Sequence, residues 1–123
     1  DHAFVSARRE YLDDNHDSFT IGIGAVSSPS LENRTLILAD PMLATGASLA
    51  QVLDLLIKRF GMPAQIHVAA VIASKEGVNK ILEALPKNGH LWVGEIDSVL
   101  TSKGYIHPGL GDAGDLAFGT KMN

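Results

Sequence analysis

Asp40 and the residues after it form the segment with the clearest capacity for chemistry. The loop from Pro41 to Ser48 contains Thr45 and Gly46 and leads from an apolar stretch into an amphipathic one. Such a loop presents backbone N–H groups, hydroxyl donors and the positive end of a helix dipole, which together can bind a phosphate group. Asp40 stands too early to cap that helix, so its carboxylate would suit ribose hydroxyls or Mg²⁺. The alternative is a structural strand-to-helix turn in which Ser48 caps the helix.

A second segment, residues 104–115, reads GYIHPGLGDAGD and is too rich in glycine for the interior of a helix or strand. Glycine admits positive φ angles and lets backbone groups approach a ligand closely. Exposed amides and carbonyls in such a loop can recognise the flat, polar edge of a nucleobase. The alternative is a surface loop without a ligand. His107 lies in this segment, but the 5 histidines of the chain show no metal-binding spacing.

Several familiar site patterns do not occur in the sequence. There is no GxxxxGKS or GxxxxGKT phosphate loop, and Gly22-x-Gly24 lacks the third glycine of a dinucleotide-binding loop. The triplet Asp13-x-Asn15-x-Asp17 begins like a calcium loop but does not continue as one. The chain has no cysteine, which excludes disulfides, thiolate catalysis and cysteine-bound metals.

The elements that must position the two loops follow an alternating pattern. Three apolar runs predict strands, at residues 35–39, 66–73 and 90–95. The first run is apolar on both faces, as in a central parallel strand that helices cover on either side. Apolar residues at helical spacing predict one helix over 48–60 and another that Ser74 caps and Pro86 ends.

This order of strands and helices predicts an α/β fold with a parallel sheet. In such sheets ligands bind beyond the carboxyl ends of the strands. The loops 40–47 and 97–114 both fall at that edge. We therefore expect the functional site to lie between them.

The residues before position 35 have a less regular pattern. Ala3–Ala7 is a short apolar run that predicts a buried strand, the charged segment Arg8–Ser18 predicts an exposed loop, and Thr20–Val26 predicts a further strand. The chain begins without methionine and enters a structured segment at once. We therefore expect it to be the later part of a longer polypeptide.

The composition is that of one globular domain, with 123 residues, 46% hydrophobic and 20% charged. A formal net charge of −4 argues against a nucleic-acid-binding surface, which is usually basic. No apolar run approaches the ~20 residues needed to span a bilayer, and no signal-peptide pattern is visible. We expect a cytoplasmic protein with a single domain over 1–123 and with neither a nucleic-acid nor a membrane partner.

Taken together, the two loops resemble the C-terminal part of uracil phosphoribosyltransferases. The string LADPMLATG at 38–46 is highly specific to that family, and GYIxPGLGDAGDxxFG at 104–119 is nearly diagnostic. The resemblance covers about residues 31–121 well and 3–10 more weakly. It implies the parallel-sheet type I phosphoribosyltransferase fold, incomplete in this chain because the first part of the family's sequence is missing.

The resemblance also implies an activity. The enzyme would be a glycosyltransferase that converts uracil and 5-phosphoribosyl 1-diphosphate (PRPP) to UMP and diphosphate in pyrimidine salvage. Mg²⁺ would be carried by the diphosphate substrate, with no metal held by the protein alone. We also expect a homo-oligomer, as is usual in the family.

Residue roles follow from the same resemblance, with Asp40 and Asp112 as catalytic residues. The residues expected to bind PRPP are Arg8, Asp40, Pro41, Met42, Leu43, Ala44, Thr45, Gly46, Ala47, Ser48 and Asp112. The residues expected to bind uracil, chiefly through backbone groups, are Ile106, Gly111, Asp112 and Ala113. The sequence departs from the family pattern where Ala47 replaces a usual glycine and Leu116 a usual arginine.

Two other functions compete with this interpretation. One is a non-catalytic nucleotide-sensing regulator on the same fold, and the other is a generic flavodoxin-like or hydrolase fragment. The base loop, residues 104–115, together with Asp40 favours the enzyme, because a pure regulator need not keep both.

Overall fold

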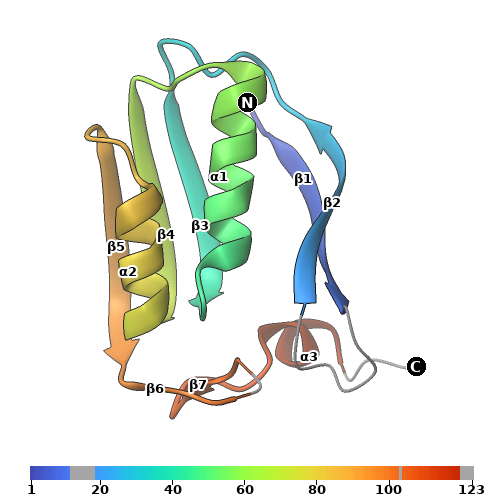
Figure 1. Cartoon of the computed structure of the whole chain (residues 1–123), viewed down its shortest axis with the longest axis vertical. Helices are drawn as coiled ribbons and strands as arrows, with labels where there is room; N and C mark the ends of the chain where they lie inside the picture. Colours follow the sequence, from blue (N-terminus) through green and yellow to red (C-terminus); the bar gives the residue numbers. More distant parts are fainter. Residues whose placement is uncertain (12–18, 103, 120–123) are drawn as a thin grey trace.

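The computed structural model describes residues 1–11, 19–102 and 104–119. Its centre is a 3-stranded parallel sheet in the order β3-β4-β5 (Figure 1). These strands are formed by Thr35–Leu43, Gln65–Ser74 and Gly89–Asp97. The predicted α/β fold with a parallel sheet is confirmed.

The two crossover helices are α1, Ala47–Phe60, and α2, Lys75–Ala84, and both cover the same face of the sheet (Figure 1). Helix α1 ends at Gly61, where a φ of 94° stops the helix and the N–H bonds back to the carbonyl of Ile57. Apolar side chains from both helices and the sheet form the core, with Leu36, Leu43, Leu53, Leu56, Ile66, Val68 and Ile81 all buried. The predicted cap of the second helix is also confirmed, because the Ser74 side chain accepts a hydrogen bond from the Gly77 N–H.

The opposite face of the sheet carries apolar side chains that are exposed in this chain. Ile37 on β3 is 68% exposed, Val71 on β4 62%, and Trp92 on β5 59%. Within the described residues, 35–39 is therefore not the central strand covered on both sides that the sequence predicts. Strand β4 is central and β3 lies at an edge, because both helices pack on one face and β3 pairs only with β4 among the described strands.

An antiparallel hairpin precedes the sheet and lies beside α1 (Figure 1). It consists of β1, Phe4–Tyr11, and β2, Phe19–Ser27. The strand predicted at 3–7 therefore runs on to Tyr11, because residues 8–11 pair with the start of β2 instead of forming a loop. That strand is not buried, since Phe4 is largely exposed. The rest of the predicted loop, 12–18, lies outside the described residues.

The C-terminal segment contains more regular structure than the glycine pattern indicates. Val99–Leu100 (β6) pairs antiparallel with Ile106–His107 (β7), and Ala113–Phe118 forms the short helix α3. These elements lie at the end of the molecule toward which β3, β4 and β5 point (Figure 1). Of the helices described, none has the length and apolar character to cross a membrane.

Candidate functional site

Strand β3 continues through the residues that the sequence assigned to a loop. Met42 and Leu43 pair with Ile72 and Ala73 of β4, so the strand does not stop at Asp40-Pro41 as predicted. The ladder with β4 holds this segment extended and confines the turn to Ala44–Gly46 before α1 begins. Asp40 is therefore a residue of the strand, and its position is fixed by the sheet.

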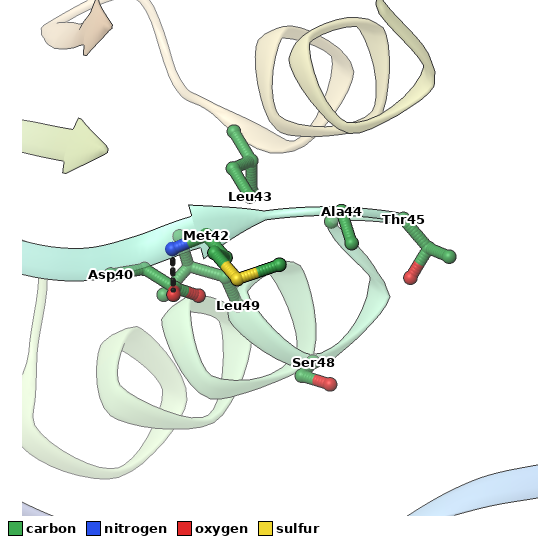
Figure 2. Close-up of a pocket in the computed structure, with 8 residues that line it drawn as sticks. Asp40, Met42, Leu43, Ala44, Thr45, Ser48 and Leu49 are labelled. Carbon is green, nitrogen blue, oxygen red and sulfur yellow. Dashed lines mark hydrogen bonds between the residues drawn. The ribbon is translucent and has the colours of Figure 1, made fainter. Parts of the chain in front are cut away.

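The Asp40 side chain is oriented by its own backbone. Its Oδ1 accepts a hydrogen bond from the Met42 N–H at 2.9 Å (Figure 2). Burial raises the pKa of this carboxyl above its ordinary value, and the Met42 hydrogen bond opposes the shift without cancelling it. As expected, Asp40 does not cap α1. Its carboxylate is instead held beside the turn, where a hydroxyl-bearing ligand would meet an oriented acceptor.

The N-terminus of α1 carries no side-chain cap. Gly46 occupies the N-cap position in the left-handed region with φ 73°, and the Thr45 Oγ1 accepts from the Ala47 N–H at 3.4 Å. The alternative in which Ser48 caps the helix is therefore wrong, because the helix begins at Ala47, before Ser48. A helix end of this kind directs backbone N–H groups and its positive dipole end toward an anion.

A cavity of about 120 Å³ lies inside this turn. Figure 2 shows the Asp40 carboxylate on one side of β3 and Leu43 on the other, with Thr45 and Ser48 along the turn. The residues lining the cavity are Asp40, Met42, Leu43, Ala44, Thr45, Gly46, Ser48 and Leu49. Of the loop residues predicted to bind PRPP, only Pro41 and Ala47 do not line it. Leu49 is the one lining residue that the sequence analysis missed, since its helical spacing marks it only as a core position.

A larger cavity of about 660 Å³ lies farther back along β3, toward the N-terminal residues, and shares Leu49 with the smaller one. Its walls include Val5, Leu36, Leu38 and Val52. It follows the amino-terminal half of the strand, away from the edge where both predicted loops lie. We therefore place the candidate site in the smaller cavity, where polar groups converge at the strand ends.

The glycine-rich segment is built on the β6-β7 hairpin. Ile106 is buried, and the Gly109 N–H donates to the Asp97 Oδ2 at 2.9 Å, which ties the loop to the last residue of β5. Gly109 has φ 53°, and a Cβ at this position would lie 2.1 Å from the carbonyl oxygen of Ile106. A side chain does not fit here, so the sharp turn of the loop depends on glycine.

The predicted uracil-binding residues fall in two places. Gly111, Asp112 and Ala113 are consecutive, with Asp112 as the N-cap of α3, where its side chain accepts from the Asp115 N–H at 2.9 Å. Ile106 lies on β7 with a buried side chain, so that only its backbone is suited to contact a ligand. Both places are at the sheet edge where β3 ends (Figure 1).

Arg8 is the predicted PRPP-binding residue that lies on the N-terminal hairpin. The backbone of Arg8 lies in β1 opposite Gly22, and its side chain lies outside what the structure describes. Within the described part of the chain, no group of three or more His, Cys, Asp or Glu side chains is arranged to hold a metal ion.

A parallel sheet, a helix end without a side-chain cap, an oriented acid and a glycine-rich loop together define an α/β protein whose strand ends have the features of a phosphate-binding site. The sequence model of the uracil phosphoribosyltransferase family matches residues 25–120. The chain belongs to that family.

Relatives and one solved structure agree with this assignment. The uracil phosphoribosyltransferase of Porphyromonas gingivalis is 43% identical over 99% of this chain and 55% of its own length. That of Burkholderia thailandensis is 50% identical over 78% of this chain and 44% of its own length. The AQ2163 protein from Aquifex aeolicus superposes with a TM-score of 0.81 at 31% identity, over 98% of this chain and 54% of that one. The chain thus spans about half the length of the curated relatives it matches.

Proposed function

We propose that the protein is a uracil phosphoribosyltransferase and that this chain is the C-terminal portion of its single catalytic domain. The observation that carries the proposal is the placement of the 120 Å³ cavity around Asp40 and the glycine-rich loop at one edge of the sheet. The family named by the relatives supplies the chemistry, namely transfer of a 5-phosphoribosyl group from PRPP to uracil.

The two loops would bind different parts of the substrates, the phosphate and ribose at the first loop and uracil at the second. The turn from Ala44 to Ser48 would surround the 5′-phosphate with backbone N–H groups and the Thr45 and Ser48 hydroxyls. Asp40 would accept hydrogen bonds from the ribose hydroxyls, for which its position beside the turn is suited. The backbones of Ile106 and of residues 111–113 would read the edge of uracil.

The reaction forms a bond from uracil N1 to C1′ while the bond from C1′ to the diphosphate oxygen breaks, and the N1 proton is lost. Positive charge develops at C1′, so catalysis depends on a fixed nucleophile and on neutralising the leaving group more than on a strong base. Asp40 and Asp112 would act beside this centre as the acidic residues of the site.

Mg²⁺ would enter this reaction as part of the substrate, bound to the diphosphate of PRPP. The donor set supports this assignment, since Asp40 is the only carboxylate among the residues lining the described cavity. A single carboxylate is typical of a site where Mg²⁺ keeps most of its ligands from phosphates and water. The leaving group would then carry its own counter-charge.

We also propose a role in pyrimidine salvage, a cytoplasmic location and a homo-oligomeric state. A role in pyrimidine salvage and a cytoplasmic location follow from the family resemblance and stay predictions. A homo-oligomer likewise follows from the family resemblance and stays a prediction. The nucleotide-sensing alternative is not favoured, because the relatives matched are named as the enzyme.

The experiment that tests the proposal is a calorimetric titration of the protein, expressed as its whole gene encodes it, with UMP. AMP and ribose 5-phosphate serve as controls, because AMP shares the phosphate and ribose while ribose 5-phosphate lacks a base. Selective binding of UMP followed by Mg²⁺-dependent UMP formation from uracil and PRPP would support the enzyme. Selective binding without turnover would instead favour the regulator, and equal binding of AMP and UMP would contradict both.

A further inference from the structure

Two residues at the carboxyl edge of the sheet form side-chain hydrogen bonds with the backbones of the two loops. Ser74 is the last residue of β4 and Asp97 the last of β5, and the two are direct partners in the parallel ladder. Neither lines the cavity around Asp40. Each nevertheless makes a side-chain hydrogen bond to the backbone of one of the two loops.

Ser74 connects the phosphate loop, which is the turn from Ala44 to Ser48, to α2. It is 2% exposed, and its hydroxyl donates to the carbonyl oxygen of Ala44 at 2.5 Å while accepting from the Gly77 N–H at 2.9 Å. A buried hydroxyl with both functions satisfied is costly to lose, because each partner is left without its bond. The Ala44 carbonyl is thereby held at a fixed distance from the first turn of α2.

Glycine packing reinforces this contact. A Cβ on Gly77 would lie 2.4 Å from the Ala44 carbonyl oxygen and 2.5 Å from that of Leu43. A Cβ on Gly46 would in turn lie 2.9 Å from the Gly77 carbonyl oxygen. The turn and α2 therefore meet backbone to backbone, and the Ser74 hydroxyl closes the contact at its edge.

Asp97 makes the corresponding contact to the base loop. Its Oδ2 accepts from the Gly109 N–H at 2.9 Å across 12 residues of sequence. Gly109 follows the β6-β7 hairpin and precedes Gly111, where the predicted uracil-binding stretch begins. The carboxylate thus fixes the stem of the base loop to the end of β5.

We propose that Ser74 and Asp97 are positioning residues that together set the separation between the phosphate loop and the base loop. The inference rests on the proposed function, in which C1′ of a ribose held at the first loop must meet N1 of a uracil held at the second. Displacement reactions are sensitive to errors of about 1 Å in such a placement. Ser74 and Asp97 are paired in the β4–β5 ladder, so the hydrogen bonds of the ladder fix the separation between the two loops.

The test compares substitutions at the two anchors in steady-state kinetics of the intact protein. Ser74→Ala and Asp97→Ala should each lower kcat roughly tenfold, because either change disturbs the separation of C1′ and N1. Ser74→Ala should in addition raise the KM for PRPP more than that for uracil, and Asp97→Ala the KM for uracil more than that for PRPP. A tenfold change corresponds to about 1.4 kcal/mol, the order of one lost hydrogen bond. Asp97→Asn keeps an acceptor oxygen of the same size, so it should stay within about threefold of the unsubstituted protein.

A purely structural role predicts a different pattern. Loss of the helix cap in Ser74→Ala should lower stability by about 1 kcal/mol whether or not the loop moves, so melting temperatures do not discriminate. If the kcat of the active protein stays unchanged in both alanine variants, or if both KM values rise equally in each variant, the proposal is overturned.

Failure of the proposed function would be recognised separately. If the unsubstituted protein forms no UMP, hydrogen exchange and carbonyl chemical shifts measured by NMR still report on the anchors. Asp97→Ala should then speed exchange of the Gly109 amide, and Ser74→Ala should shift the Ala44 carbonyl resonance, each without the other effect. An unchanged Gly109 amide or Ala44 carbonyl would overturn the anchoring itself.

Discussion

The two loops at the carboxyl edge are attached to the molecule in different ways. The phosphate loop is a short turn between β3 and α1, and it also touches the backbone of α2 at Gly77. The base loop is longer, stands on the β6-β7 hairpin and leads into α3, a helix without a buried residue whose Phe118 is 93% exposed. One loop is part of the core, whereas the other is joined to it mainly at its stem.

This difference separates two tasks that a nucleotide site must perform. A phosphate is recognised by N–H groups and a helix dipole, which require a rigid backbone frame. A base is recognised by the shape and polarity of a loop, and loops outside the core can vary without disturbing the sheet. Substitutions in the phosphate loop should therefore change stability together with binding, while those in the base loop should change binding more than stability.

Asp40→Asn should have the largest effect on activity. It removes a charge from the site while leaving the backbone of the phosphate loop in place. Asparagine has the size of aspartate and can still accept from the Met42 N–H, but it lacks the charge that strengthens bonds to ribose hydroxyls. We expect kcat/KM for PRPP to fall about a hundredfold, the usual scale for one lost polar contact in a preorganised site. Steady-state rates at fixed uracil measure the loss, and a fall of less than about threefold would contradict the role given to Asp40.

Asp40→Asn should also change the free energy of unfolding, and the direction of the change follows from the burial of the carboxyl. The pKa of Asp40 is raised in the folded protein, so the ionised carboxylate opposes folding at neutral pH. Asp40→Asn should be as stable as the unsubstituted protein or more stable at pH 7, and the difference should vanish once the pH falls below the carboxyl's ordinary value. Activity should decline as the pH falls, with a midpoint above the ordinary pKa of an aspartate, because only the ionised carboxylate accepts hydrogen bonds from both ribose hydroxyls.

Gly77→Ala and Gly109→Ala compare the two loops at their closest contacts. Each added Cβ would meet a carbonyl oxygen, that of Ala44 at 2.4 Å for Gly77 and that of Ile106 at 2.1 Å for Gly109. Crowding of this kind costs about 1–3 kcal/mol when it must be absorbed by a packed core. We expect Gly77→Ala to lower the unfolding free energy of the protein and to weaken PRPP binding together.

Gly109→Ala should mainly weaken uracil binding, with less loss of stability than Gly77→Ala. Urea unfolding and the two KM values, measured for both variants, test the comparison. If Gly109→Ala proves the more destabilising of the two, the base loop belongs to the core, and the division of tasks between the loops is wrong.

Much of this arrangement follows from local sequence patterns. The alternation of apolar runs with helical stripes was sufficient to predict β3, α1, β4, α2 and β5, because each pattern reflects burial of one face. Ser74 as the cap of α2 also follows from residue type and position. Both loops were placed at one edge by topology alone, since parallel strands share the direction of their carboxyl ends.

Other features depend on pairing partners that no local pattern reveals. Asp40-Pro41 reads as the end of a strand, yet the ladder with β4 carries β3 on to Leu43. The apolar run 35–39 indicates burial on both faces, but which face the helices cover is decided by the whole sheet. The anchoring of Gly109 by Asp97 joins positions 12 apart in the sequence, and a lone aspartate before a loop gives no sign of it.

Gly111→Ala should have the smallest effect, and it sharpens the contrast within the base loop. Gly111 has φ 80°, but a Cβ there would meet nothing within 4 Å, unlike one at Gly109. Only backbone strain is added, about 1–2 kcal/mol for an alanine in the left-handed region. We expect the KM for uracil to rise a few-fold while the KM for PRPP stays constant. Gly111→Asn is the matched control, because asparagine tolerates this conformation and should recover most of the loss. If asparagine is no better than alanine, the cause is contact with the ligand and not strain, and residue 111 then lies closer to uracil than the open space around it indicates.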